Sequence, residues 1–265
     1  MISFAPIWAV VLRHTRMWRR DPNYLLGGFY WPLLDILTWG FLGAWIQKLQ
    51  GSLQFQNYEI IALLGVLLWQ IVGRGSNLII VSFSEEIWSH NLVNLFSLPL
   101  RTIEWVCGSI LFFVIMISMV SIFCLLTIYF LYNISFWYLL STFLIFAPPL
   151  LFFTISLGFI CLQIITFLGK RGIELGFVIG WALLPFSGAC YPIDVLPHWG
   201  QMISKFVPMS YVFQGMRNYL VHQQDPTADL IKGYVLGILY AACAIVLFAV
   251  CFKRSKQNGL AQLID

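Results

Sequence analysis

The chain has 265 residues, of which 60% are hydrophobic and only 10% are charged, and its formal net charge is +4. A soluble globular domain carries about 25% charged residues, so this composition excludes one, and it also excludes a disordered chain. The small positive charge gives no reason to expect nucleic-acid binding, and we expect a single membrane domain over residues 1–265.

Residues 3–20 predict an amphipathic helix and not a cleaved signal peptide, because they lack a continuous apolar core and a small-residue cleavage site. Apolar side chains from Phe4 to Trp18 recur at helical spacing, while Arg13, Arg16 and Arg20 fall on the other side. Such a helix is expected to lie in the membrane interface, with its basic face towards anionic headgroups. It is either a plain membrane anchor or a docking surface for a cytoplasmic partner.

Six apolar stretches follow that could each cross a bilayer as a helix, which takes about 20 residues. They cover residues 24–46, 58–81, 103–132, 137–167, 174–190 and 230–252. Because the apolar runs are continuous and do not alternate, they favour helices over a barrel. The sequence therefore predicts an all-α polytopic membrane protein with six transmembrane helices. Pro148 and Pro149 predict a kink in the fourth span.

The positive charges predict the orientation. Ten Lys and Arg residues fall on the side that holds both ends of the chain, and four fall on the other side. Because positively charged loops stay in the cytoplasm, both termini are expected to be cytoplasmic.

Polar residues inside the first two spans form a candidate intramembrane site. Gln70, Arg74 and Asn77 share one helix face, and Asp35 lies near the middle of the first span. A central Arg costs about 2.5–3.5 kcal/mol on insertion scales, so it needs an explanation. Three stay open: Arg74 pairs with Asp35 and locks two helices, it lines a path that meets an anionic headgroup, or it snorkels to the cytoplasmic interface.

Two further segments are neither spans nor short turns. Residues 83–101 predict a short cytoplasmic helix with acids at its start and Arg101 at its end, as the helix dipole favours. Its apolar face must be covered by a partner, by the chain's own spans or by headgroups. Residues 191–229 are too apolar for a plain loop, and they predict short helices that dip into the outer leaflet between spans five and six.

Motifs of catalysis and nucleotide binding are missing from the sequence. HExxH, GxSxG and GxxxxGK[ST] do not occur, and the six cysteines form no CxxC pair. We therefore expect no enzyme activity, no metal site and no cofactor in this chain.

Two series of residues resemble the permeases of the ATP-binding-cassette (ABC) type 2 exporter family. The first has paired acids, a Leu-rich stretch, Pro-Leu, and then an acid and a Gly; its positions are Glu85, Glu86, Leu92, Leu95, Phe96, Pro99, Leu100, Glu104 and Gly108. The second follows the fifth span, at Ser187, Gly188, Pro192, Leu196, Pro197, Trp199, Pro208, Tyr211 and Arg217. Family members commonly carry charged residues and a Gly-Thr pair after the acids, where this chain has Ile87, Trp88, His90 and Asn91.

The resemblance implies that two permeases form a dimer, most simply a homodimer, around a path, and that two separate ATPase subunits with ATP and Mg bind beneath them. Helix 83–101 is similar to the coupling helix that seats in the ATPase. The expected coupling residues are Glu85, Glu86, Asn91, Leu92, Leu95, Phe96, Pro99, Leu100 and Arg101. The expected function is export of a hydrophobic or amphipathic substrate (lipid, lipid-linked glycan or drug) from the cytoplasm or inner leaflet. The expected location is a bacterial inner membrane.

Two other classes of protein fit the sequence less well. An ion-coupled secondary transporter often shows internal repeats and several midplane acids, but here only Asp35 lies near a midplane. An integral membrane enzyme would need clustered His, Asp or Glu residues at one interface, and the sequence shows no such cluster.

Overall fold

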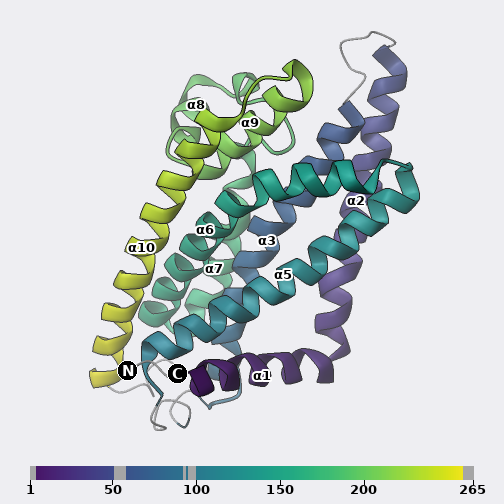
Figure 1. Ribbon diagram of the computed structural model, residues 1–265. Helices are drawn as coiled ribbons and strands as arrows, with labels where there is room; N and C mark the ends of the chain where they lie inside the picture. Colours follow the sequence, from purple (N-terminus) through teal and green to yellow (C-terminus); the bar gives the residue numbers. More distant parts are fainter. Residues whose placement is uncertain (1–3, 51–57, 92–93, 95–99, 259–265) are drawn as a thin grey trace.

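The computed structural model describes residues 4–50, 58–91, 94 and 100–258, and every regular element in these residues is a helix. Helix α1 (Phe4–Arg20) lies across one end of a bundle of long helices, and α2 (Pro22–Gln50) rises from its end (Figure 1). Asp21 forms the elbow between them, because its Oδ1 accepts a hydrogen bond from the backbone N–H of Asn23 at 2.9 Å. An Asp cap followed by Pro in the first helical position is a common helix start.

Among the described residues, five helices are long and apolar enough to cross a membrane: α2, α3 (Tyr58–Trp88), α5 (Thr102–Tyr132), α6 (Phe136–Leu168) and α10 (Thr227–Asn258). They confirm the all-α polytopic fold and contain five of the six predicted spans. Helix α3 is central. In its most apolar 18-residue stretch 78% of the residues are buried, compared with 18% in the corresponding stretch of α2. Helix α6 changes direction partway along (Figure 1), as expected at Pro148 and Pro149, which remove helical hydrogen bonds.

The predicted fifth span, 174–190, is not one continuous helix. Helix α7 (Arg171–Ala182) has 12 residues and is followed by the 3₁₀ turn η2 (Leu184–Phe186). Twelve residues reach only about 18 Å, which is short of a hydrocarbon core of about 30 Å. The count of six transmembrane helices is therefore not confirmed by the described residues.

The chain nevertheless runs along α3 in this region. A Cβ atom at Gly180 would lie 3.2 Å from Ser76 Oγ, and one at Gly65 would lie 2.8 Å from the carbonyl oxygen of Ala189. The segment from α7 to Ala189 thus lies antiparallel to α3. From Ser76 to Gly65 it covers about 16 Å of that helix, at about 1.5 Å per residue. Small residues permit this close approach within one subunit.

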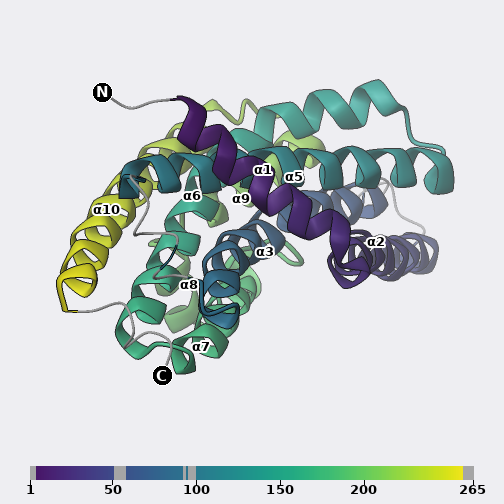
Figure 2. The same cartoon turned by 90° about the horizontal axis from the view of Figure 1, so that it is seen from below.

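Short helices occupy the segment where the sequence predicts them. They are η3 (Ile193–Val195), α8 (His198–Ser204) and α9 (Pro208–His222). Figure 1 shows α8 and α9 at the end of the bundle opposite α1. The view from below in Figure 2 shows α1 lying over α5 at its own end of the bundle, away from α8 and α9.

Candidate functional site

An ion pair joins α1 to the end of α3. Arg13 Nη2 donates to Glu86 Oε2 at 2.7 Å, and Asn91 Nδ2 donates to the same oxygen at 3.1 Å. The Glu86 side chain is 0% exposed, whereas that of Arg13 is 36% exposed. We refer to Arg13, Glu86 and Asn91 as the Arg13 cluster. A carboxylate that is fully buried needs such a charged, hydrogen-bonded partner.

Helix α1 is also held against α5. At Gly108 a Cβ atom would lie 2.7 Å from Val10 Cβ and 3.0 Å from the Ile7 carbonyl oxygen, so this glycine of the predicted motif permits the close contact. The ring of His14 packs against Phe112 with centroids 5.2 Å apart. Burial, together with the positive charge of Arg13, lowers the pKa of His14 to about 4. His14 is therefore neutral at neutral pH and is part of the packing of α1.

The expected coupling helix differs from the prediction at its start. Residues 83–88 are the last turns of α3, so no separate helix begins at residue 83. His90 ends α3 with a φ of 52°, and the backbone N–H groups of His90 and Asn91 donate to the carbonyls of Ile87 and Glu86 at 3.1 and 3.0 Å. This is a Schellman ending, in which the left-handed position is usually glycine. His90 thus takes a conformation suited to the glycine that family members commonly carry in this region.

The other expected coupling residues are distributed around this ending. Glu85 and Leu100 are half-buried and Arg101 is exposed. The backbone N–H of Arg101 donates to Glu104 Oε2 at 3.1 Å, so the motif acid Glu104 caps the start of α5. Leu92, Leu95, Phe96 and Pro99 lie outside the described residues.

The intramembrane polar residues form a hydrogen-bonded chain between α2 and α3. Gln70 Nε2 donates to Asp35 Oδ2 at 2.9 Å, and Arg74 Nε donates to Gln70 Oε1 at 2.8 Å. Asp35 and Arg74 do not form the direct ion pair that was one of the three alternatives, because the Gln70 amide lies between them. We refer to Asp35, Gln70 and Arg74 as the Arg74 network.

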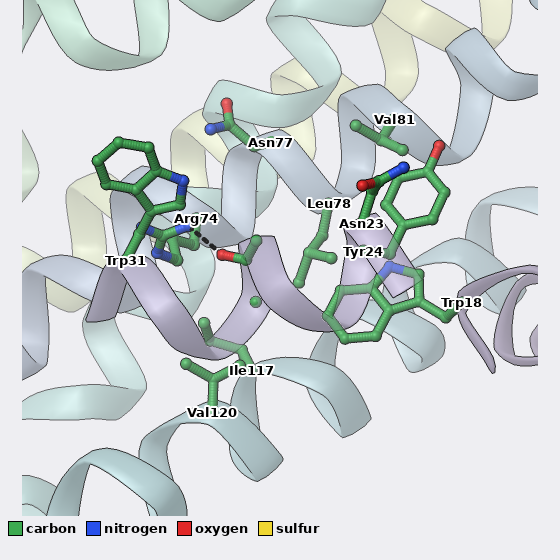
Figure 3. Close-up of a pocket in the computed structure, with 12 residues that line it drawn as sticks. Trp18, Asn23, Tyr24, Trp31, Arg74, Asn77, Leu78, Val81, Ile117 and Val120 are labelled. Carbon is green, nitrogen blue, oxygen red and sulfur yellow. Dashed lines mark hydrogen bonds between the residues drawn. The ribbon is translucent and has the colours of Figure 1, made fainter. Parts of the chain in front are cut away.

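Arg74 also makes a bond towards the elbow that joins α1 and α2. Its Nη1 donates to the Gly27 carbonyl at 2.9 Å, which is the dashed line in Figure 3. Gly27 is four residues beyond Asn23, in the second turn of α2, so the guanidinium lies only about 6 Å along α2 from Asn23. The side chain therefore extends from the middle of α3 towards the α1 end, as a snorkelling arginine does.

A cavity of about 250 Å³ lies beside this guanidinium, between the elbow, α3 and α5. Asn77, the fourth predicted polar residue, lines it together with Trp18, Asn23, Tyr24, Gly27, Gly28, Trp31, Arg74, Leu78, Val81, Ile117 and Val120. Figure 3 shows Trp31 near Arg74 and the side chains of Trp18, Asn23 and Tyr24 towards the other end.

The predicted residues after α7 hold one turn together. Arg217 Nη2 donates to the Gly188 carbonyl at 2.8 Å, and Ser187 Oγ accepts a bond from the backbone N–H of Ala189 at 3.0 Å. Gly188 has a φ of 73°, a conformation that glycine adopts without steric cost. This turn places the Ala189 carbonyl against Gly65 of α3.

The rest of that series shapes α8 and α9. The Tyr211 hydroxyl donates to the Lys205 carbonyl at 2.9 Å, and the Trp199 ring packs on Phe186 with centroids 5.9 Å apart. The remaining residues flank the short helices: Pro192 and Leu196 around η3, Pro197 before α8 and Pro208 at the start of α9. Each of these contacts stabilises the segment itself.

Sequence reasoning missed the roles of Arg13 and His14. It placed Arg13 on a basic face towards headgroups, but the structure directs it to Glu86. A partial signal was present, because an acid at the end of a span needs a cation nearby and α1 was the basic segment on the same side. Within the described part of the chain, no group of three or more His, Cys, Asp or Glu residues could hold a metal ion.

Comparison with known protein families identifies the family of this chain. The family model described as ABC-2 type transporter matches residues 6–221, from α1 to the end of α9. A search of curated proteins gives no significant match. Since the matched region is well over half of the chain, the protein belongs to the ABC-2 type transporter family and is a multi-pass membrane permease that works with an ABC ATPase subunit.

Proposed function

We propose that this permease exports a hydrophobic or amphipathic substrate, such as a lipid, a lipid-linked glycan or a drug, from the cytoplasm or the inner leaflet. Two copies surround the path, and two ATPase subunits supply ATP and Mg²⁺ from below. The membrane is a bacterial inner membrane with both termini in the cytoplasm. The observation that supports this proposal most strongly is the Arg13 cluster, which lies where the family resemblance assigns coupling.

The Arg13 cluster connects Asn91, which precedes the expected coupling segment at residues 92–101, to three helices. Asn91, which leads into that segment, bonds to Glu86 on α3, and Glu86 bonds to Arg13 on α1. Helix α1 in turn packs on α5 at Gly108. A displacement near Asn91 therefore moves α1, α3 and α5 together, and α3 is continuous over 31 residues, or about 46 Å.

Coupling requires that the ATPase contacts differ between two states of the permease. In our proposal the segment around residues 92–101 makes those contacts, and the Arg13 cluster passes the movement to the membrane helices. Docking and transmission are then separate steps, which different residues serve.

The test separates these two steps in the purified complex of permease and ATPase. Leu92→Asp should abolish co-purification of the ATPase, because it places a charge on the expected apolar docking face. Arg13→Ala should retain the ATPase but reduce the change in ATP hydrolysis that the permease produces. Arg19→Ala, an exposed arginine of the same helix, is the matched control.

Two results would contradict the proposal. One is full ATPase binding and normal hydrolysis in both Leu92→Asp and Arg13→Ala. The other is transport by the permease that follows an ion gradient in the absence of any ATPase, which would favour a secondary transporter.

A further inference from the structure

The cavity beside Arg74 has the features of a site for a charged headgroup. Among the lining residues that the structure describes, Arg74 is the one charged side chain, so the cavity presents a positive charge within apolar surroundings. Its balancing acid, Asp35, is not among the lining residues and is reached only through Gln70. An anion inside the cavity would therefore meet the guanidinium and not the carboxylate.

Arg74 keeps donor capacity for such an anion. Its Nε bonds to Gln70 and its Nη1 bonds to Gly27, while no bond from Nη2 is found among the described residues. A guanidinium carries five N–H groups, and arginine is well suited to bind phosphate oxygens. The two existing bonds fix the orientation of the group, so a ligand need not order it.

The depth and size of the cavity suit a headgroup and exclude a whole lipid. The guanidinium lies about 6 Å along α2 from Asn23. Trp18 and Tyr24, stacked with centroids 6.3 Å apart, lie on either side of the α1–α2 elbow, and such aromatic residues are enriched at membrane interfaces. A volume of about 250 Å³ is below the range of about 300–1,000 Å³ for sites that enclose drug-sized ligands.

We propose that this cavity binds the phosphate headgroup of an anionic amphiphile from the leaflet at the α1 end, with Arg74 Nη2 as the anchoring donor. The amphiphile could be a resident phospholipid or the transported substrate, and both sources share this chemistry. The site itself does not depend on the proposed export function; only its assignment to a transported substrate does.

Binding is measured on the full-length chain, stripped of lipid in detergent and without ATPase or ATP. The probes are phosphatidylglycerol, which is anionic, and phosphatidylcholine, which is zwitterionic, and native mass spectrometry counts the lipids retained. Both lipids offer the same phosphate oxygens, but the choline ammonium of phosphatidylcholine would lie near the Arg74 guanidinium and be repelled by it. We therefore expect the wild type to retain phosphatidylglycerol about tenfold better. Equal retention of the two lipids would overturn the proposal.

Two variants test the site in different ways. Arg74→Gln removes the charge and should abolish the preference for phosphatidylglycerol. Gly27→Leu should reduce retention of both lipids, because Gly27 lines the cavity and its Cβ would meet nothing within 4 Å, so a bulky side chain fits there while the backbone bond to Arg74 is kept. If Arg74→Gln does not fold, Gly27→Leu still tests the site, because leucine favours a helix more than glycine does and this variant should fold.

Arg19→Gln is the control, because it removes an exposed positive charge near the elbow without altering the cavity. It should retain the wild-type preference. If it lost the preference as fully as Arg74→Gln, or if Arg74→Gln and Gly27→Leu both bound like the wild type, the site would be refuted.

A second arm distinguishes the two sources. The complex with its ATPase is reconstituted with fluorescently labelled phosphatidylglycerol, and ATP-dependent loss of label from the leaflet at the α1 end is followed by quenching. Movement that Gly27→Leu abolishes supports a site for transported substrate, whereas binding without movement supports a resident lipid. Because the first arm contains no ATPase, failure of the proposed export leaves its result intact.

Discussion

Arg13 and Arg74 both connect to an acid on a neighbouring helix, but they do so in different ways. Arg13 touches Glu86 directly at 2.7 Å, whereas Arg74 reaches Asp35 through the amide of Gln70, by bonds of 2.8 and 2.9 Å. The direct pair joins α1 to the last turn of α3. The connection through Gln70 orients Arg74, and it leaves the Arg74 Nη2 group available for a ligand in the cavity. The comparison shows how the same two charges can serve either to fasten helices or to present a cation.

Removal of Arg13 should have the largest effect. Arg13→Ala leaves the Glu86 carboxylate buried without its cation, which typically costs about 3–5 kcal/mol, and thermal unfolding in detergent measures the loss. The double variant Arg13→Met with Glu86→Met should recover most of the stability, because neither charge then remains buried. A loss below that of the exposed control Arg19→Ala would show that the pair does not fasten α1.

Acidification should weaken the same attachment. The pKa of His14 is lowered in the folded protein to about 4, so the unfolded state binds a proton first as the pH falls. The contribution of neutral His14 is complete above pH 6.5 and decreases by about 3 kcal/mol in total as the pH falls towards 4. Unfolding between pH 7.5 and 4.5 should thus depend less on pH in His14→Gln, and an identical dependence in both proteins would contradict the assignment.

Interruption of the Arg74 network should have an intermediate effect. Gln70→Leu removes both bonds of the amide, and each polar group left unsatisfied costs about 1–3 kcal/mol. A double-mutant cycle of Asp35→Asn and Arg74→Gln measures the coupling free energy between the two charges. This coupling should be present when Gln70 is intact and should largely disappear in the Gln70→Leu background. A coupling energy that is the same in both backgrounds would mean that the charges interact without the amide.

Loss of Asn91 should have the smallest effect. Asn91→Ala removes one hydrogen bond of 3.1 Å to Glu86 but leaves the ion pair in place, so unfolding should change by about 0.5–1.5 kcal/mol. A change as large as that of Arg13→Ala would indicate that Asn91, and not the arginine, is the main partner of Glu86.

The membrane-spanning helices could be predicted from the sequence, because a bilayer imposes a minimum length and an apolar composition on any helix that crosses it. Five predicted spans lie within α2, α3, α5, α6 and α10. The fifth stretch is not one continuous helix, because Pro185 and the turn at Gly188 interrupt a segment whose composition alone is apolar. Composition measures hydrophobicity but not whether the backbone hydrogen bonds continue.

Polar partners were harder to predict than spans. The sequence placed Gln70 and Arg74 on one face and suggested Asp35 as the opposing acid, which the structure connects through the amide. It could not show that Arg13 turns towards Glu86, because that depends on how α1 docks on Gly108 of α5. Such tertiary contacts between segments distant in sequence leave no periodic signal.

A charge exchange at the Arg13 cluster shows whether this cluster carries movement between the ATPase and the membrane helices. The variants Arg13→Glu and Glu86→Arg are made singly and together, and ATP hydrolysis by the purified complex is compared with that of the free ATPase subunit. We expect each single variant to keep the ATPase bound but to lose the permease's effect on hydrolysis, and we expect the double variant to regain it. Normal coupling in both single variants, or no recovery in the double variant while the ATPase remains bound, would contradict this role of the cluster.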